Sequence, residues 1–95
     1  MPDAYEILFR PEVEEDLRSI GRPHQRRALA AIEERLSSHP EQYGRPLGGD
    51  LAGLRRIRFG DFRIAYQVKS GRVVVWAVLH RKDIYAQLAR RFLDR

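Results

Sequence analysis

LRRIRFGDFRIAY, the sequence of residues 54–66, has the pattern of a tight β-hairpin. Apolar and charged residues alternate on both sides of a central Gly-Asp pair, and a two-residue turn containing glycine is typical of hairpins. This turn places Arg58 opposite Arg63. Because paired residues point to the same face of a sheet, Arg56, Arg58 and Arg63 are expected on one face. The opposite face is then apolar and consists of Ile57, Phe59, Phe62 and Ile64.

Arginines that face each other across a hairpin repel, and such like-charged pairs destabilise a sheet. A bound anion removes this repulsion. The guanidinium group binds phosphate through two parallel hydrogen bonds and stays protonated under physiological conditions. We therefore interpret Arg56, Arg58 and Arg63 as a phosphate-binding cluster. The alternative is a solvated arginine surface that holds no ligand.

Composition narrows the class of protein. The 95 residues suffice for one small domain, 1–95, and contain no cysteine, which excludes disulfides and thiolate metal sites. His24 and His39 lack partners at metal-ligand spacing, so we expect neither a metal nor another cofactor. No apolar run reaches the length of a membrane span, and residues 1–10 lack a signal-peptide pattern. The sequence thus predicts a soluble, cytoplasmic protein without membrane contact.

Charge is distributed unevenly along the chain, whose net charge is +5. Residues 1–40 hold eight Asp or Glu against six Lys or Arg, whereas residues 41–95 hold five against twelve. The positive charge therefore lies in the second part. An arginine-rich segment of this kind favours nucleic acid or an acidic protein as a partner.

The remaining sequence predicts a two-layer α+β domain. Two amphipathic helices in succession form an αα-hairpin that packs on a small, mostly antiparallel sheet (β-α-α-β-β-β), and a short C-terminal helix follows. Pro11 suits the start of the first helix and Gly21 its end. The expected elements are a strand at 4–9, a helix between Pro11 and Gly21, a helix at 23–38, a loop at 41–53, strands at 54–59, 62–69 and 72–80, and a helix at 84–93.

Strict alternation sorts the side chains of the strand at 72–80. The helix-covered face is expected to receive Val73, Val75, Ala77 and Leu79. The face of Arg63 is expected to receive Val74, Trp76, Val78 and His80. Because this strand is apolar on both faces, we expect a cover on the arginine face too, either the C-terminal helix or a partner protein.

LHRKDIY, residues 79–85, supplies the second group of candidates, because functional side chains often lie where a strand ends. His80, opposite Asp61 in this register, belongs to the residue type that exchanges protons near neutral pH; the alternative is a structural histidine. Arg81 follows the strand end and is expected to turn toward the arginine face. Tyr85 is expected to stack on a base or donate a proton, or else to be a half-buried helix aromatic.

These motifs, together with the order of the elements, resemble the RelE/ParE superfamily of bacterial toxins from type II toxin–antitoxin systems, and the RelE branch in particular. The resemblance spans nearly the whole chain. It rests on the hairpin pattern RIRFGDFRIAY at 56–66 and on HRKDIY at 80–85.

The resemblance implies a function. RelE-type toxins are ribosome-dependent endoribonucleases that enter the ribosomal A site and cut the mRNA codon there without a metal. The ribose 2′-hydroxyl attacks the adjacent phosphate, which gives a 2′,3′-cyclic phosphate and a 5′-hydroxyl end. A cognate antitoxin binds the toxin in a hetero-oligomer and blocks it. The chain is thus expected to be a metal-independent mRNA interferase with an antitoxin, the ribosome and mRNA as partners.

The resemblance also implies roles for individual residues. Arg56 and Arg58 occupy the positions of two lysines in a well-studied relative, one of which is proposed as the general base. Arg63 corresponds to a phosphate-binding arginine, Arg81 to an arginine that stabilises the leaving group or acts as acid, and Tyr85 to a tyrosine that stacks on or orients the substrate.

Arginine at position 58 departs from that pattern, because arginine is a poor base. Either another group removes the 2′-proton, with His80 as the candidate, or positioning and charge stabilisation provide most of the rate. The expected catalytic residues are Arg58, Arg63, His80, Arg81 and Tyr85.

Two other functions fit the same residues. One is that of a ParE-like toxin that cleaves no RNA and inhibits DNA gyrase by protein contacts. The other is that of a plain RNA- or protein-binding module. A shared fold does not separate these functions, and the HRKDIY motif favours cleavage.

Overall fold

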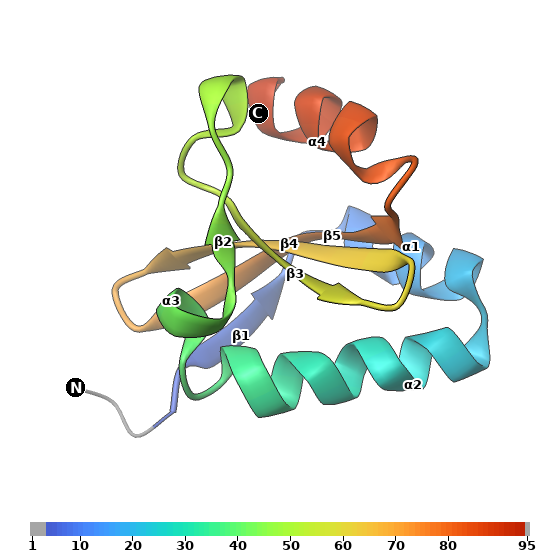
Figure 1. Cartoon of the computed structure of the whole chain (residues 1–95), viewed down its shortest axis with the longest axis horizontal. Helices are drawn as coiled ribbons and strands as arrows, with labels where there is room; N and C mark the ends of the chain where they lie inside the picture. The colour runs from blue at the N-terminus through green and yellow to red at the C-terminus, as the bar shows by residue number, and fades with distance from the viewer. Residues whose placement is uncertain (1–3, 95) are drawn as a thin grey trace.

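The computed structural model describes residues 4–94 and shows one sheet between helices (Figure 1). β1 runs parallel to β5, and all other neighbouring strands are antiparallel. The strands, in their order across the sheet, are β1 (Glu6–Phe9), β5 (Arg72–His80), β4 (Phe62–Lys69), β3 (Arg55–Phe59) and β2 (Arg45–Pro46).

Helices cover both faces of this sheet. The hairpin of α1 (Glu12–Ile20) and α2 (Arg22–Ala31) lies on one face, and a π-helical turn, η1 (Ile32–Leu36), continues α2. On the other face lies α4 (Ile84–Leu93). The predicted α+β class, with an αα-hairpin on a mostly antiparallel sheet and a C-terminal helix, is confirmed.

The expected loop at 41–53 contains three short elements. They are α3 (Pro40–Tyr43), the edge strand β2, and a 3-10 turn, η2 (Gly49–Leu51). Only two residues of β2 pair with β3, which is too short a run to show alternation in the sequence. Proline at the second position is tolerated because an edge strand has no further neighbour to bond.

The hairpin of β3 and β4 has the predicted register. Arg58 pairs with Arg63, and the flanking pairs Ile57–Ile64 and Phe59–Phe62 follow from it. Gly60 has a φ of +59°, which suits the first position of a two-residue II′ turn. The arginine pair therefore lies on one face of the sheet, as the alternation predicts.

A β-bulge in β5 overturns the predicted sides of the residues that follow it. Ala65 pairs with Ala77, whereas Tyr66 pairs with Val75, so Trp76 is the extra residue of β5. One extra residue moves all later side chains to the opposite face.

Before the bulge, the predicted sides are correct for Val73 and Val75, and Trp76 lies on the arginine face as expected. After the bulge the predictions are wrong, because alternation restarts one residue late. Val78 and His80 lie on the face covered by α1 and α2, and Ala77 and Leu79 lie on the arginine face, which α4 covers.

A buried ion pair holds the bulge. Asp16 of α1, only 4% exposed, accepts a hydrogen bond on Oδ2 from the amide of Val78 at 3.1 Å. Arg91 of α4 donates from Nη1 to the carbonyl of Trp76 at 3.1 Å. The two side chains bind each other through Nη1–Oδ2 at 2.7 Å and Nη2–Oδ1 at 2.8 Å. The hydrogen bond to the Asp16 carboxylate raises the pKa of Arg91.

These side chains replace a missing strand neighbour. β1 pairs with β5 only as far as Phe9 and Val75, and the amide of Arg10 bonds the carbonyl of Val75 at 2.9 Å. Beyond that point the edge of β5 has no strand beside it. Buried amides and carbonyls need partners, and the carboxylate and the guanidinium supply them.

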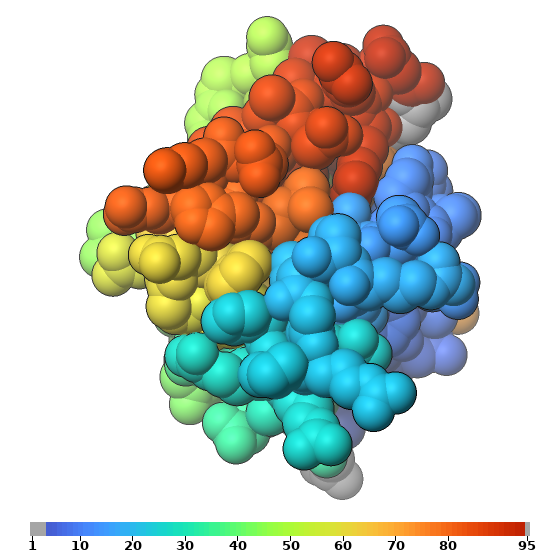
Figure 2. Space-filling view, turned by 90° about the vertical axis from the view of Figure 1, so that its right-hand side faces the viewer, coloured from blue at the N-terminus to red at the C-terminus, as the bar shows by residue number. Residues whose placement is uncertain are grey.

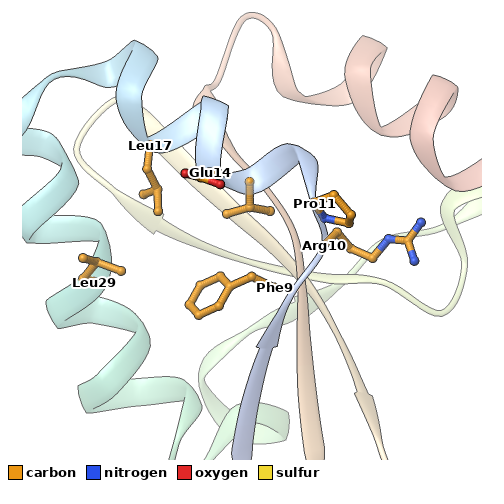
Figure 3. Close-up of a pocket in the computed structure, with 7 residues that line it drawn as sticks. Phe9, Arg10, Pro11, Glu14, Leu17 and Leu29 are labelled. Atoms are coloured by element: carbon orange, nitrogen blue, oxygen red, sulfur yellow. The ribbon is translucent and has the colours of Figure 1, made fainter.

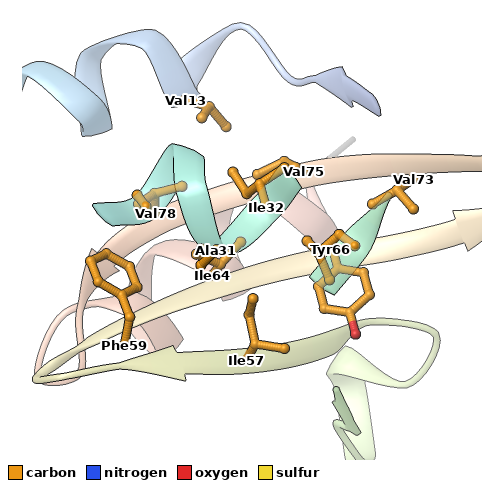
Figure 4. Close-up of a cluster of buried hydrophobic side chains, with 12 residues drawn as sticks. Val13, Ala31, Ile32, Ile57, Phe59, Ile64, Tyr66, Val73, Val75 and Val78 are labelled. Atoms are coloured by element: carbon orange, nitrogen blue, oxygen red, sulfur yellow. The ribbon is translucent and has the colours of Figure 1, made fainter. Parts of the chain in front are cut away.

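Two hydrophobic clusters fill the spaces on the two faces. The larger lies between the sheet and the α1–α2 hairpin, where Val78 points inward beside Val75 and Ile64 (Figure 4). The smaller lies under α4, where the rings of Trp76 and Phe92 meet edge to face at 5.1 Å. The C-terminal helix is thus the cover of the arginine-side apolar residues.

The segment around α3 is pinned to the sheet by two side chains. Arg55 donates from Nη2 to the carbonyls of Glu41 and Gly44, each at 2.7 Å, and the Tyr66 hydroxyl donates to the carbonyl of Pro40. A Cβ atom on Gly44 would lie 1.8 Å from the Tyr66 hydroxyl oxygen. Only glycine fits here without moving the tyrosine.

Gly44→Ala is therefore expected to lower the free energy of unfolding by about 2 kcal/mol, because the added methyl overpacks a fully buried ring. Urea titration measures the change. Gly48→Ala is the matched control, since nothing lies within 4 Å of its added carbon, and it should change the free energy by less than about 0.5 kcal/mol. Equal effects of the two variants would contradict the packing described for Tyr66.

Candidate active site

Four of the predicted arginines and one tyrosine come together on the sheet face that carries α4. Arg56 and Arg58 project from β3, Arg63 from β4, and Arg81 from the turn after β5, while Tyr85 lies in the first turn of α4. Their proximity shows in the electrostatics of Arg63. Burial lowers its pKa most, the charges of Arg58 and Arg56 lower it further, ionised Tyr85 would raise it, and Arg81 again lowers it.

Arg63 is the centre of this group, which we call the arginine cluster (Arg56, Arg58, Arg63 and Arg81). As a whole residue, Arg63 is only 8% exposed. Nη1 donates to the carbonyls of Gly60 and Phe62, at 3.1 and 2.9 Å, so the turn fixes the guanidinium plane. Within residues 4–94 the other guanidinium nitrogens form no hydrogen bond, which leaves them available to an anion.

Arg81 turns toward the arginine face of the sheet, as predicted from the strand end, and its charge acts on Arg63. Its amide donates to the carbonyl of Asp61 at 2.8 Å, and its Nε lies 3.9 Å from Oδ1 of Asp61. Figure 2 shows the segment after β5 (orange) directly against the hairpin tip near residue 60 (yellow). Tyr85 is 41% exposed beside it, so its ring is accessible to a ligand.

His80 does not join this group, and its predicted place opposite Asp61 on the arginine face is wrong. It pairs with Phe62 on the face covered by α1 and α2, where the two rings lie edge to face at 5.6 Å. Its Nδ1 accepts a hydrogen bond from the amide of Lys82 at 3.1 Å. The physical reason is the bulge at Trp76, which moves His80 to the other side of the sheet.

Three residues beside the arginine cluster carried no signal in the sequence. Arg45 of β2 lies opposite Arg56, and together with Arg35 and Tyr43 it lines a hollow of about 260 Å³ that reaches Arg58. These residues come from three short elements, η1, α3 and β2, that show no common pattern in the sequence. The pairing of β2 with β3 brings Arg45 to the site, and the hydrogen bond from Arg35 Nη1 to the carbonyl of Arg58 holds Arg35 there.

A second hollow, of about 320 Å³, lies between the end of β1, α1 and α2. Phe9, Leu17 and Leu29 point toward it (Figure 3), and Phe9 and Leu29 are 46% and 40% exposed. Its lining is mainly apolar, which is unlike a phosphate site and typical of a surface that binds protein.

Two further observations concern the described residues only. Across 4–94, no three His, Cys, Asp or Glu side chains are grouped so that they could hold a metal ion. In that same range, every helix is too short or too polar to cross a bilayer.

Comparison with known proteins decides the family. Residues 7–85 match the family described as the ParE toxin of type II toxin–antitoxin system, parDE. The chain belongs to this family. It is a toxin of a type II toxin–antitoxin system within the RelE/ParE superfamily, as the two motifs indicated.

Individual relatives agree with this assignment. Toxin RelG of Mycobacterium tuberculosis is 34% identical over 87 residues, which cover 85% of this chain and 95% of RelG. The toxin–antitoxin complex RelBE2 of the same organism contains a chain with a TM-score of 0.70 and 30% identity, covering 82% of this toxin and 99% of that chain. A RelB–RelE complex from Methanococcus jannaschii gives a TM-score of 0.67 and 28% identity, with coverages of 84% and 96%.

The ion pair of Asp16 and Arg91 positions α4, and with it Tyr85, so its loss should be costly. Asp16→Asn leaves Arg91 as an uncompensated buried charge and is expected to lower the free energy of unfolding by about 3–5 kcal/mol in urea titration. The matched control is Glu14→Gln, which removes an exposed pair on the same helix and should cost less than about 1 kcal/mol. A similar loss in both variants would show that the buried pair does not anchor α4.

Proposed function

We propose that this toxin is a ribosome-dependent, metal-independent endoribonuclease that cuts mRNA and so inhibits translation. The observation that carries the proposal is the meeting of Arg56, Arg58, Arg63, Arg81 and Tyr85 on one face, from two strands, the turn after β5 and a helix. Guanidinium groups at this density suit a phosphodiester whose charge grows during reaction. The similarity to toxins named RelG and RelE supports the same activity.

The reaction proposed is an internal transfer at phosphorus. The ribose 2′-oxygen attacks the adjacent phosphorus, a P–O2′ bond forms, and the P–O5′ bond breaks. The 2′-hydroxyl gives up its proton, the 5′-oxygen takes one up, and the products are a 2′,3′-cyclic phosphate and a 5′-hydroxyl end. No water molecule is consumed in this step.

The residues divide this work by position. Arg63, fixed by the hairpin turn, and Arg58, directly opposite, bind the non-bridging oxygens, and Arg56 extends this binding along β3. Arg81, at the rim, stabilises the leaving 5′-oxygen. Tyr85 stacks on a base and orients the nucleotide. Charge that is already in place before the transition state needs no reorganisation during it.

The catalytic power proposed here comes from positioning and charge stabilisation rather than from a base on the toxin. His80, the only candidate proton acceptor in the sequence motif, lies on the opposite face. Effective alignment of a nucleophile contributes several kcal/mol by itself. The proton leaves to solvent or to the ribosome in this scheme.

A cognate antitoxin is the proposed protein partner, in a toxin–antitoxin hetero-oligomer. Phe9 and Leu29 are 46% and 40% exposed, which is unusual for large apolar side chains that line one hollow. The hollow lies between β1, α1 and α2, and its lining includes no residue of the arginine cluster. The similar RelE toxins were solved in complexes with RelB, which supports such a partner. Because its proposed target is the ribosome, we expect the toxin to act in the cytoplasm.

Inhibition of DNA gyrase by protein contacts is the second candidate function. The family match to the ParE toxin favours it. It predicts inhibited supercoiling by purified gyrase and intact mRNA. The two candidates are therefore separated by one pair of assays on the same preparation.

The double variant Arg63→Ala/Arg81→Ala should lose cleavage by about 10³-fold or more, because two groups that stabilise transition-state charge are removed. Primer extension on mRNA from cell-free translation measures it, with circular dichroism to confirm folding. Arg22→Ala/Arg26→Ala removes equal charge from exposed sites on α2 and should cleave within about 3-fold of wild type. Wild-type cutting by the first variant, or uncut mRNA at an inhibitory dose, would contradict the proposed function.

The variant His80→Gln tests whether His80 acts as the general base. We expect a cleavage rate within about 3-fold of wild type and an unchanged pH–rate profile, because the imidazole lies on the face opposite the phosphate. A general base would instead account for about 100-fold or more, and its removal would abolish the titration near neutral pH. That result would restore His80 to the catalytic residues.

A further inference from the structure

The hollow beside the arginine cluster extends the positively charged face toward β2. Four arginines and one tyrosine ring dominate its lining, with Ile57 as the remaining residue: Arg35, Tyr43, Arg45, Ile57, Arg56 and Arg58. Arg56 and Arg58 also belong to the arginine cluster. The hollow and the cluster are therefore two parts of one continuous surface.

The sheet register places these side chains at regular spacing. Arg45 pairs with Arg56, as Arg58 pairs with Arg63, so all four are on the same face with paired Cα atoms about 5 Å apart. Arg35 of η1 stands at the free edge of β3, where its Nη1 donates to the carbonyl of Arg58 at 2.9 Å.

Tyr43 presents its ring on a fixed backbone. Its amide donates to the carbonyl of His39 at 3.2 Å, and its ring lies edge to face with that of His39 at 6.2 Å. The bonds from Arg55 and Tyr66 to the α3 segment hold this backbone against the sheet. Yet the tyrosine is 55% exposed, so packing does not explain the presence of this ring.

The charge of the hollow is uncompensated. Among residues 4–94, no carboxylate forms an ion pair with Arg35, Arg45, Arg56 or Arg58. A protein partner usually buries an apolar centre, and this lining has only Ile57 and the tyrosine ring to offer. Arginines around an exposed aromatic are instead typical of a groove for single-stranded nucleic acid, where phosphates bind the charges and bases stack.

We propose that this hollow is a second RNA subsite of the toxin. Arg45 and Arg35 bind a backbone phosphate next to the one that is cleaved, and Tyr43 stacks on the base of that neighbouring nucleotide. The subsite rests on the proposed function in taking RNA as the substrate. It holds the strand on both sides of Arg56 and Arg58, and so fixes the scissile phosphate in line with Arg63.

Binding of an RNA that cannot be cut tests the subsite without requiring cleavage. The probe is a fluorescent single strand of about nine nucleotides, 2′-O-methylated throughout, with affinity read by fluorescence anisotropy. Tyr43→Ala should weaken binding about 10-fold, and Tyr43→Phe, which keeps the stacking ring, should bind as wild type. Arg45→Ala should weaken binding and reduce the salt dependence by about 0.7 in the slope of log K against log salt.

The matched control is Arg26→Ala. Arg26 lines a hollow of about 230 Å³ with Arg22, Gln25 and Leu29, which has charge but no aromatic ring. This variant loses the same charge as Arg45→Ala and should change affinity by less than about 2-fold.

A second set of RNA probes lacks one base, at a different position in each probe. At the stacked position the missing base and Tyr43→Ala should not add, because both remove the same contact.

The outcomes separate this inference from the proposed function. If wild type binds RNA with the expected variant pattern but cuts no mRNA, the subsite stands and the proposed cleavage fails. Equal RNA affinity of wild type, Tyr43→Ala and Arg45→Ala overturns the subsite, whatever the cleavage assay shows. Loss of antitoxin affinity in these two variants, with RNA affinity unchanged, would overturn it as well, because the hollow would then be a protein-binding surface.

Discussion

The hydrogen bond from the Val78 amide to the buried carboxylate of Asp16 is the contact on which the rest of the architecture depends. It gives the Val78 amide a partner at an edge of β5 that no strand covers, and so stabilises the extra residue, Trp76. Every side chain after that residue changes face because of it. Val78 enters the main core, His80 leaves the arginine face, and the same carboxylate binds Arg91 and holds α4 over the sheet.

The ion pair of Asp16 and Arg91 contributes more to the geometry of the protein than to its net stability. Burying two charges costs several kcal/mol per ion, which their attraction and their bonds to Val78 and Trp76 roughly offset. What the pair secures is one register of β5 and one position of α4. Arg81 and Tyr85 flank the start of α4, so this position determines where they lie relative to Arg58 and Arg63. In the proposed function, a bound RNA phosphate would relieve the repulsion within the arginine cluster.

Local patterns predicted the local elements well. The alternation around Gly60 fixed the pairing of Arg58 with Arg63, and the bounds of β4, β5 and α4 matched the structure. The bulge was beyond such reasoning, because its cause is a pair of residues 75 positions apart, and Asp16 looks in the sequence like one more acid of the first helix. The prediction for the face of His80 was wrong because it did not include this bulge. Tyr43 and Arg45 were missed because a two-residue strand has no period to recognise.

Hydrogen exchange of the Val78 amide, followed by NMR, tests this account most directly. Wild type should protect this amide as strongly as the central residues of β4, although no strand lies beside it on that edge. In Asp16→Asn its exchange should accelerate by more than about 10-fold relative to the amide of Tyr66, which bonds within the sheet and serves as the internal reference. Rapid exchange of Val78 in wild type, or equal acceleration of both amides in the variant, would contradict the claim that Asp16 holds the bulge.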